Sequence, residues 1–240
     1  GSETRVSVSS SSSSNSTSAL GKLRILLTGE YGFHTIVMAY CWLAVTFIYY
    51  GLTFQASAMW GDLYTNGALL ALAELPAQVM VYFSVDRKGV GRRGTQASGF
   101  ALAAAALLTI ALPGLSNEMS IALAMVGKVG ATAAFVVVYV FAGELFPTVL
   151  RASALGLCNF GSRIGGVLAP LMMHFSIEAA LVVFGIMSAV GCWATLLLPE
   201  TLGKELQDHV VSTEAGEATG SVTDKGVLGG ADTGRDYRTL

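Results

Sequence analysis

The chain has 240 residues, of which 53% are hydrophobic and only 12% charged, and its formal net charge is −2 at pH 7. Soluble domains carry about 25% charged residues, so this composition excludes an ordinary soluble globule and indicates a chain solvated mainly by lipid. There is no basic excess of the kind that binds nucleic acid, which excludes nucleic acid as a main partner. Of the 30 charged residues, 13 lie in the 164 residues of 36–199, which we therefore predict to be a transmembrane domain.

Both ends of the chain are polar. Residues 1–35 contain a serine run with too few apolar groups to offset the entropy of ordering, and we expect a flexible cytoplasmic segment there. Residues 200–240 mix Gly, Thr, Ser and Asp, which predicts a disordered cytoplasmic tail. The chain begins with Gly and has no apolar leader region, so we expect a fragment or a trimmed product without a signal peptide.

The middle of the chain contains six apolar stretches between short polar breaks. Each is long enough to cross ~30 Å of hydrocarbon at about 1.5 Å per residue, which predicts an all-α membrane protein built as a six-helix transmembrane bundle. Gly127, Gly130, Gly161 and Gly165 are spaced so that helices can approach closely, and we expect them at helix contacts. The predicted spans are 36–55, 63–85, 95–114, 119–142, 152–174 and 178–198.

Lys and Arg residues occur in alternate breaks, and short basic loops stay in the cytoplasm. The breaks at 56–62, 115–118 and 175–177 contain none of them. This pattern predicts a multi-pass protein with both termini in the cytoplasm. The basic residues of the other breaks are Lys22, Arg24, Arg87, Lys88, Arg92, Arg93, Arg151 and Lys204.

Three charged residues fall near the middle of predicted spans, namely Glu74, Lys128 and Arg163. Their offsets from the span ends correspond to roughly 14 to 18 Å, close to the midplane of the bilayer. Each costs about 2.5–3.5 kcal/mol on insertion scales, so they are expected to face the bundle interior or a watery cavity. We interpret them as a solute site, whereas the alternative is that Glu74 pairs with Lys128 or Arg163 as a packing strut.

The three charges sum to +1, which favours an anionic or zwitterionic solute over a bare cation. Polar residues lie one helical turn away from them, and Tyr49 and Tyr50 offer either cation–π faces or interfacial anchors. The predicted substrate-binding residues are Tyr49, Tyr50, Glu74, Gln78, Lys128, Asn159 and Arg163.

The Cys and His residues show no pattern that indicates a metal or catalytic site. The three cysteines lie far apart in apolar runs, and the three histidines share no ligand spacing. We predict no catalytic residues, no metal and no cofactor, and therefore no enzymatic activity.

Three loop motifs resemble those of the major facilitator superfamily. Residues 86–93 read DRKGVGRR and resemble its D-R-x-G-R-R loop, residues 144–151 read ELFPTVLR and match its E-x-F-P-T-x-x-R pattern, and residues 198–203 read LPETLG and resemble its P-E-T-x-G exit. The chain thus resembles the C-terminal six-helix half of such a transporter. The resemblance implies a cytoplasmic latch, or gate, made of Asp86, Arg87, Arg92, Arg93, Glu144 and Arg151.

Within that superfamily, the residues around Tyr49, Glu74, Lys128 and Arg163 are most similar to the organic cation, organic anion and carnitine transporter family. The resemblance implies alternating-access transport of small organic ions across the plasma membrane. A basic residue at Arg163 goes with anion or carnitine carriers, in agreement with the +1 count.

The resemblance also implies a partner, the N-terminal six-helix half. Because the site of such a carrier lies between two halves, we expect that the 240 residues alone do not transport. Two alternatives remain open. One is a sugar-type facilitator, which shares the loop motifs, and the other is a truncated membrane isoform that does not transport.

Overall fold

The computed structural model describes residues 19–59, 63–112 and 114–203, while residues 1–18, 60–62, 113 and 204–240 lie outside the described residues. All of the described residues belong to one compact unit, Gly1–His209. The secondary structure of this described part consists of helices without any strand, which confirms the all-α fold class. In chain order the elements are α1 (Ala19–Leu27), α2 (Gly29–Met59), α3 (Leu63–Ser84), α4 (Gly91–Ile110), α5 (Asn117–Leu145), α6 (Thr148–Leu171), the 3-10 helix η1 (Met172–His174) and α7 (Ile177–Leu196).

Each of the six predicted spans coincides with one long helix, from α2 to α7. The ends differ by several residues because hydropathy marks the hydrocarbon, whereas capping groups decide where a helix begins. The Ser116 hydroxyl accepts a hydrogen bond from the Met119 amide at 3.3 Å and so starts α5. The Ser176 hydroxyl does the same for α7, with the Ala179 amide at 3.4 Å.

Parts of both predicted terminal segments belong to the described structure. Residues 19–35, expected to be flexible, contain α1 and the first turns of α2, and Leu26 in this region is fully buried. At the other end Glu200 and Thr201 are held by hydrogen bonds to the ends of other helices. Composition does not predict this order, because a few specific contacts, rather than average hydropathy, hold both regions in place. The remainder of the predicted segments, 1–18 and 204–240, lies outside the described residues.

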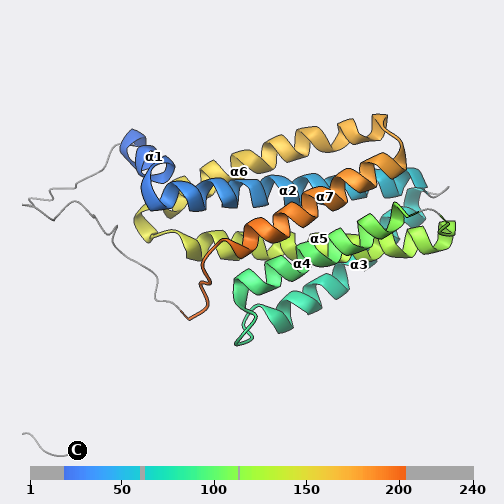
Figure 1. Cartoon of the computed structure of the whole chain (residues 1–240), viewed down its shortest axis with the longest axis horizontal. Helices are drawn as coiled ribbons and strands as arrows, with labels where there is room; N and C mark the ends of the chain where they lie inside the picture. The colour runs from blue at the N-terminus through green and yellow to red at the C-terminus, as the bar shows by residue number, and fades with distance from the viewer. Residues whose placement is uncertain (1–18, 60–62, 113, 204–240) are drawn as a thin grey trace, which may run out of the picture. The chain divides into compact units, whose positions relative to one another are not determined.

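Within the described residues, four helical segments are long and apolar enough to cross a membrane by length and composition: Tyr31–Gln55, Gly67–Ser84, Glu118–Leu145 and Ile177–Leu196. The helices α4 and α6 are not among them, because both begin with polar and basic residues and α6 also carries Arg163. Both nevertheless pack in the same bundle, α4 along α5 and α7, and α6 along α2 (Figure 1). The chain is thus a multi-pass membrane protein.

Glycines allow the closest helix contacts. A Cβ at Gly161 would lie 2.4 Å from the Ala39 carbonyl oxygen, and one at Gly165 would lie 2.5 Å from the Leu43 carbonyl oxygen. Gly130 meets α4 in a similar way, and Gly127 contacts Leu107. These contacts confirm that the four glycines lie at helix contacts, and at Gly130, Gly161 and Gly165 the absence of a side chain lets two helix backbones come close together.

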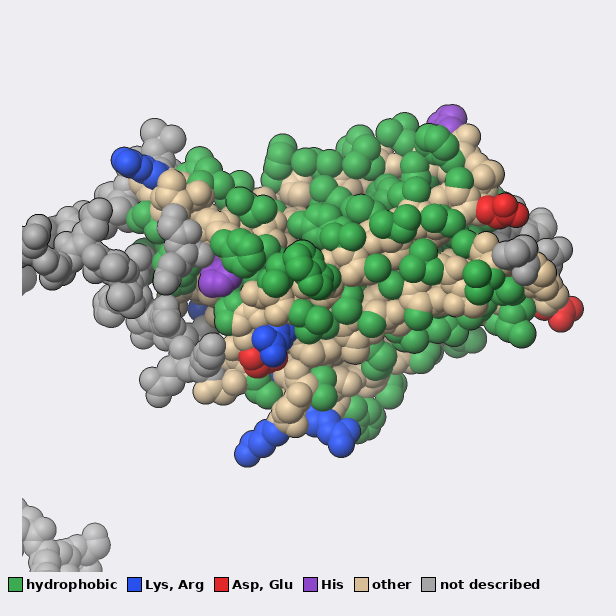
Figure 2. Space-filling view, viewed as in Figure 1, with side chains coloured by type: hydrophobic (Ala, Val, Ile, Leu, Met, Phe, Trp, Pro, Cys, Tyr) green, Lys and Arg blue, Asp and Glu red, His purple; other side chains and the backbone are tan. Residues whose placement is uncertain are grey.

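The outer surface has the character expected of a lipid-facing bundle. On the face seen in Figure 2, hydrophobic side chains cover the middle of the helices, and charged side chains lie toward their ends. In water so much exposed apolar surface is unfavourable, whereas hydrocarbon solvates it.

Candidate functional site

The Lys128 side chain lies where three helices meet. It extends from α5, is only 1% exposed, and places its Nζ 2.7 Å from the Thr53 hydroxyl and 3.3 Å from the Tyr49 carbonyl oxygen, both on α2. The carboxylate of Glu74 on α3 lies 3.7 Å from the same Nζ. The ammonium is therefore compensated from two neighbouring helices.

Tyr49 connects the two charges of this cluster. Its hydroxyl donates a hydrogen bond to the Glu74 carboxylate, and its ring centroid lies 3.2 Å from the Lys128 Nζ, which is a cation–π contact. Thr53, one turn further along α2, donates to the Tyr49 carbonyl oxygen at 2.7 Å and thereby orients its own oxygen toward the lysine. Glu74 and Lys128 thus form the ion pair that the sequence left open as an alternative. Tyr49 contacts both partners of this pair, through its hydroxyl and its ring.

A chain of aromatic rings continues from this cluster along α2 and α5. Tyr49 stacks on Phe135 with 5.0 Å between ring centroids and contacts Tyr50 edge-on at 5.3 Å. Phe135 lies 5.7 Å from Tyr139, which in turn lies 4.4 Å from Trp42. Tyr50 and Tyr139 are exposed, so this row of aromatic side chains presents open ring faces to a solute with a cationic or aromatic group.

Sequence reasoning did not assign Thr53, Trp42, Phe135 or Tyr139 to the site. Helical spacing was the available signal, because Phe135 and Tyr139 are four residues apart on α5, and Trp42 and Tyr49 are seven apart on α2. Such pairs share a face of their helix. The relative rotation of α2 and α5, which decides whether the two faces meet, is not encoded in either spacing.

Arg163 does not join Glu74 and Lys128. Its side chain is exposed on α6 and forms no ion pair within the described part of the chain. The α6 residues next to Arg163 face α2. Gly161 and Gly165 contact the α2 backbone, and the Ser162 hydroxyl accepts a hydrogen bond from the Thr46 hydroxyl at 2.9 Å. This packing turns Arg163 away from α2, so the three charges divide into the Glu74–Lys128 pair and a separate cation on an exposed face of α6.

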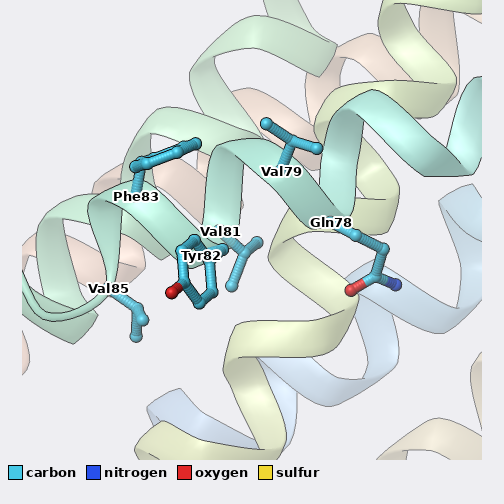
Figure 3. Close-up of a pocket in the computed structure, with 6 residues that line it drawn as sticks. All are labelled: Gln78, Val79, Val81, Tyr82, Phe83 and Val85. Carbon is cyan, nitrogen blue, oxygen red and sulfur yellow. The ribbon is translucent and has the colours of Figure 1, made fainter.

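The remaining predicted substrate residues lie on exposed or half-buried faces. Asn159 is half-buried on α6, one turn before Arg163, and Tyr50 is exposed on α2. Gln78 is exposed on α3 and lines an open pocket of about 510 Å³ that does not include Glu74 (Figure 3). Because the other lining residues are apolar or aromatic, this pocket offers one amide to a polar ligand. The lining residues are Gln78, Val79, Val81, Tyr82, Phe83 and Val85.

The predicted latch residues Asp86, Arg92 and Glu144 do meet, at the end of the bundle where α4 begins and α5 ends. The Arg92 guanidinium contacts the Glu144 carboxylate at 2.9 Å and Asp86 at 3.0 Å, and it donates to the Val85 carbonyl oxygen at 3.2 Å. The Thr201 hydroxyl donates to Glu144 at 2.7 Å. The cluster therefore joins α4 and α5 to the loop before α4 and to the segment after α7.

Glu200 caps α4. Its carboxylate accepts the backbone N–H groups of Arg92 at 3.0 Å and Arg93 at 3.2 Å, which are otherwise unpaired donors at the helix start. Gly91 precedes them with φ +63°, and a Cβ there would lie 2.5 Å from the Glu200 carboxyl carbon. The sequence contains the motif of Glu200 and Thr201, but their contacts were not predicted because they join residues far apart in the chain, 108 positions for Glu200 and Arg92 and 57 for Thr201 and Glu144.

The other latch residues, Arg87, Arg93 and Arg151, form no ion pairs among the described residues. The Arg93 guanidinium donates to the Leu198 carbonyl oxygen at 3.4 Å. Arg87 is exposed, and its side chain has no partner among the described residues. Arg151 is half-buried, and two of its guanidinium nitrogens are buried without a partner in the described part of the chain. Among the described residues, none of these three arginines forms an ion pair with Glu144.

Comparisons with known proteins identify the class to which this bundle belongs. Residues 12–210 match the family described as Sugar (and other) transporter. The chain therefore belongs to this family of the major facilitator superfamily, and its relatives there include members of solute carrier family 22 and an organic cation transporter-like protein.

Three relatives illustrate the similarity. Solute carrier family 22 member 15 of Xenopus tropicalis is 38% identical over 72% of this chain and 34% of its own length. Solute carrier family 22 member 2 of Homo sapiens is 30% identical over 80% of this chain and 35% of its own length. The organic cation transporter-like protein of Drosophila melanogaster is 31% identical over 85% of this chain and 35% of its own length.

The chain thus spans about a third of the length of the curated relatives it matches. These relatives are named as carriers and transporters, which agrees with the prediction that this chain is not an enzyme.

Proposed function

We propose that the chain forms half of the pathway of a secondary carrier that moves small organic ions across the plasma membrane by alternating access. The observation that carries this proposal is the cluster of Lys128, Glu74 and Tyr49 within helices that are otherwise apolar. Ionised groups at this depth are unfavourable, and membrane proteins retain them mainly at solute or ion pathways. In this account the complementary surface comes from an N-terminal six-helix half.

The preferred solutes are zwitterions such as carnitine and organic anions, ahead of pure cations. Arg163 supports this preference, because its exposed guanidinium has no ion pair among the described residues and its planar donors suit a carboxylate. Asn159, one turn away, supplies a further polar group. We assign the carboxylate of the solute to Arg163.

Glu74 and the aromatic chain suit the other end of a zwitterion. The Glu74 side chain is 35% exposed, so one side of the carboxylate remains accessible beside Lys128. An ammonium group can approach it across the exposed ring of Tyr50. In this assignment Lys128 neutralises Glu74 when the site is empty, and a cationic group competes for the same carboxylate. Gln78 adds a hydrogen-bonding amide one turn along α3.

The latch is assigned a gating role on the proposed cytoplasmic side. Its ion pairs join the ends of α4 and α5, and they are expected to break and re-form as the two halves rock against one another. The distribution of Lys and Arg supports placing both termini in the cytoplasm. Arg87 is available to the partner half, since its side chain is exposed and has no charged partner among the described residues. Arg151 also lacks a charged partner there, but two of its guanidinium nitrogens are buried.

A sugar-type facilitator is the second candidate, because the matched family is described as Sugar (and other) transporter. Sugars are bound through neutral hydrogen-bonding groups, and a site for them has no need of Glu74, Lys128 and Arg163. The two candidates therefore predict different effects of removing a charge.

Arg163→Ala tests the proposal in a full-length carrier that joins this chain to an N-terminal half. We expect uptake of carboxylated solutes to fall at least about tenfold, as for the loss of a charge-assisted bidentate contact worth ~1.5–3 kcal/mol. Uptake of labelled carnitine and of tetraethylammonium is measured in cells, together with surface abundance. Lys88→Ala is the matched control, because Lys88 is likewise an exposed cation without a described side-chain partner and is not one of the latch residues. Unchanged carnitine uptake in Arg163→Ala would remove the assigned role.

A further inference from the structure

The short helix α1 presents two leucines on one side. Leu23 and Leu27 are 38% and 51% exposed, whereas Leu26 is fully buried where α1 contacts α2 and α6. Leu23 and Leu27 lie one helical turn apart and so share a face. Two exposed leucines on a nine-residue helix require an explanation, because the same helix already buries Leu26 against the bundle.

Two basic residues border this apolar face. In a helix each residue is rotated by about 100°, so Lys22 and Arg24 flank Leu23 on opposite sides. Neither forms an ion pair with a described residue. An apolar stripe between two long cationic side chains is the arrangement of helices that lie in the membrane interface, where Lys and Arg reach phosphate groups while leucines enter the acyl boundary.

The junction with α2 fixes the position of α1. The Thr28 hydroxyl donates to the Arg24 carbonyl oxygen at 2.5 Å, and Gly32 lets the Leu27 carbonyl oxygen approach so closely that a Cβ would lie 2.9 Å from it. Figure 1 shows α1 at the end of the bundle where α2 and α6 begin. The contacts therefore hold α1 against the bundle end.

The apolar face of α1 continues into the surface of α2. Phe33 and Ile36, in the first turns of α2, are 52% and 64% exposed. They begin the exposed apolar surface of a membrane-crossing helix, Tyr31–Gln55. We propose that α1 is an interfacial helix that inserts Leu23 and Leu27 into the bilayer spanned by the chain and binds its anionic lipid headgroups through Lys22 and Arg24.

The insertion is measured by fluorescence quenching on the 240-residue chain in vesicles of phosphatidylcholine and phosphatidylserine. A small environment-sensitive label is attached to Leu23→Cys or Leu27→Cys in a Cys192→Ser background, since Cys41 and Cys158 are buried. Lys88→Cys is the matched control, because Lys88 is an exposed basic residue in the loop before α4. We expect shallow spin-labelled lipids to quench positions 23 and 27, and aqueous iodide to quench position 88 severalfold more strongly than either.

Two results would overturn the proposal. One is iodide quenching at positions 23 and 27 equal to that at 88. The other is protection from both iodide and lipid quenchers, which would mean that protein covers this face.

The charge contribution is tested by Lys22→Gln with Arg24→Gln. In phosphatidylserine-containing vesicles each basic residue strengthens surface binding roughly fivefold, so lipid quenching at position 27 is expected to fall to its value in pure phosphatidylcholine. Arg87→Gln with Lys88→Gln removes the same charge from exposed positions before α4 and is expected to leave this quenching unchanged. Equal quenching in the two double variants would contradict the role of Lys22 and Arg24.

Discussion

At the scale of single residues, Lys128 shows how a buried ammonium is accommodated. A hydroxyl, a carbonyl oxygen, an aromatic face and a carboxylate surround its Nζ, and together they replace the water lost on burial. Glu74 is the only one of these groups that carries a formal charge, and it also accepts the Tyr49 hydroxyl. Removing either charge therefore has a different consequence from removing both.

Glu74→Gln is expected to destabilise the chain more than Lys128→Met, because it leaves a fully buried cation without its counter-charge. The loss is on the order of 2 kcal/mol, below the ~3–5 kcal/mol of a fully buried pair because Glu74 is partly exposed. The double variant should recover part of the loss relative to Glu74→Gln. Thermal unfolding midpoints in detergent give the order of the three variants. Additive losses would show that the two charges do not interact.

Glu74 and Lys128 also show how far the sequence determines the site. Helix length and the cost of burying charge placed both residues at one depth, and their pairing was one of two alternatives that remained open. Arg163 lies in the same depth range by sequence, yet it faces outward because Gly161 and Gly165 turn the opposite face of α6 toward α2. Depth follows from counting residues, whereas rotation depends on which helix each face packs against.

At the scale of elements, the contact between α2 and α6 depends on the glycines of α6. A Cβ at Gly165 would lie 2.5 Å from the Leu43 carbonyl oxygen, so Gly165→Ala must push the helices apart. We expect a loss of about 1–3 kcal/mol, typical of overpacking. Gly156→Ala, in the same helix with nothing within 4 Å of the added Cβ, should be neutral or stabilising by ~0.5–1 kcal/mol. Equal unfolding midpoints for the two variants would contradict this packing.

The start of α4 allows a similar comparison between two glycines of one loop. Both Gly89 and Gly91 have positive φ, at +98° and +63°, but only Gly91 has the Glu200 carboxylate against it. Gly89→Ala should therefore introduce backbone strain alone, of order 1 kcal/mol. Gly91→Ala should also displace the Glu200 cap and accelerate hydrogen exchange at the Arg92 and Arg93 amides. Equal exchange rates in the two variants would mean that Glu200 does not protect these amides.

At the scale of the whole molecule, the bundle was predictable because hydropathy is a property of each segment alone. The six helices coincide with the six predicted spans, although α4 and α6 fall below the hydropathy of the other four. The ordered segments at 19–35 and 200–203 were not predictable from composition, since they depend on a buried Leu26 and on the contacts of Glu200 with the start of α4. The aromatic contacts between α2 and α5 were not predictable either, because they depend on how the two helices pack against each other.

The central claim is that this chain supplies one half of an organic-ion pathway, and solute uptake into proteoliposomes tests it most directly. The full-length carrier and the isolated 240-residue chain are reconstituted separately and assayed with labelled carnitine, benzoate, tetraethylammonium and glucose. The account predicts saturable uptake of carnitine or benzoate by the full-length carrier, slower uptake of tetraethylammonium, and none by the isolated chain. Saturable uptake of glucose without any of the organic ions would contradict it.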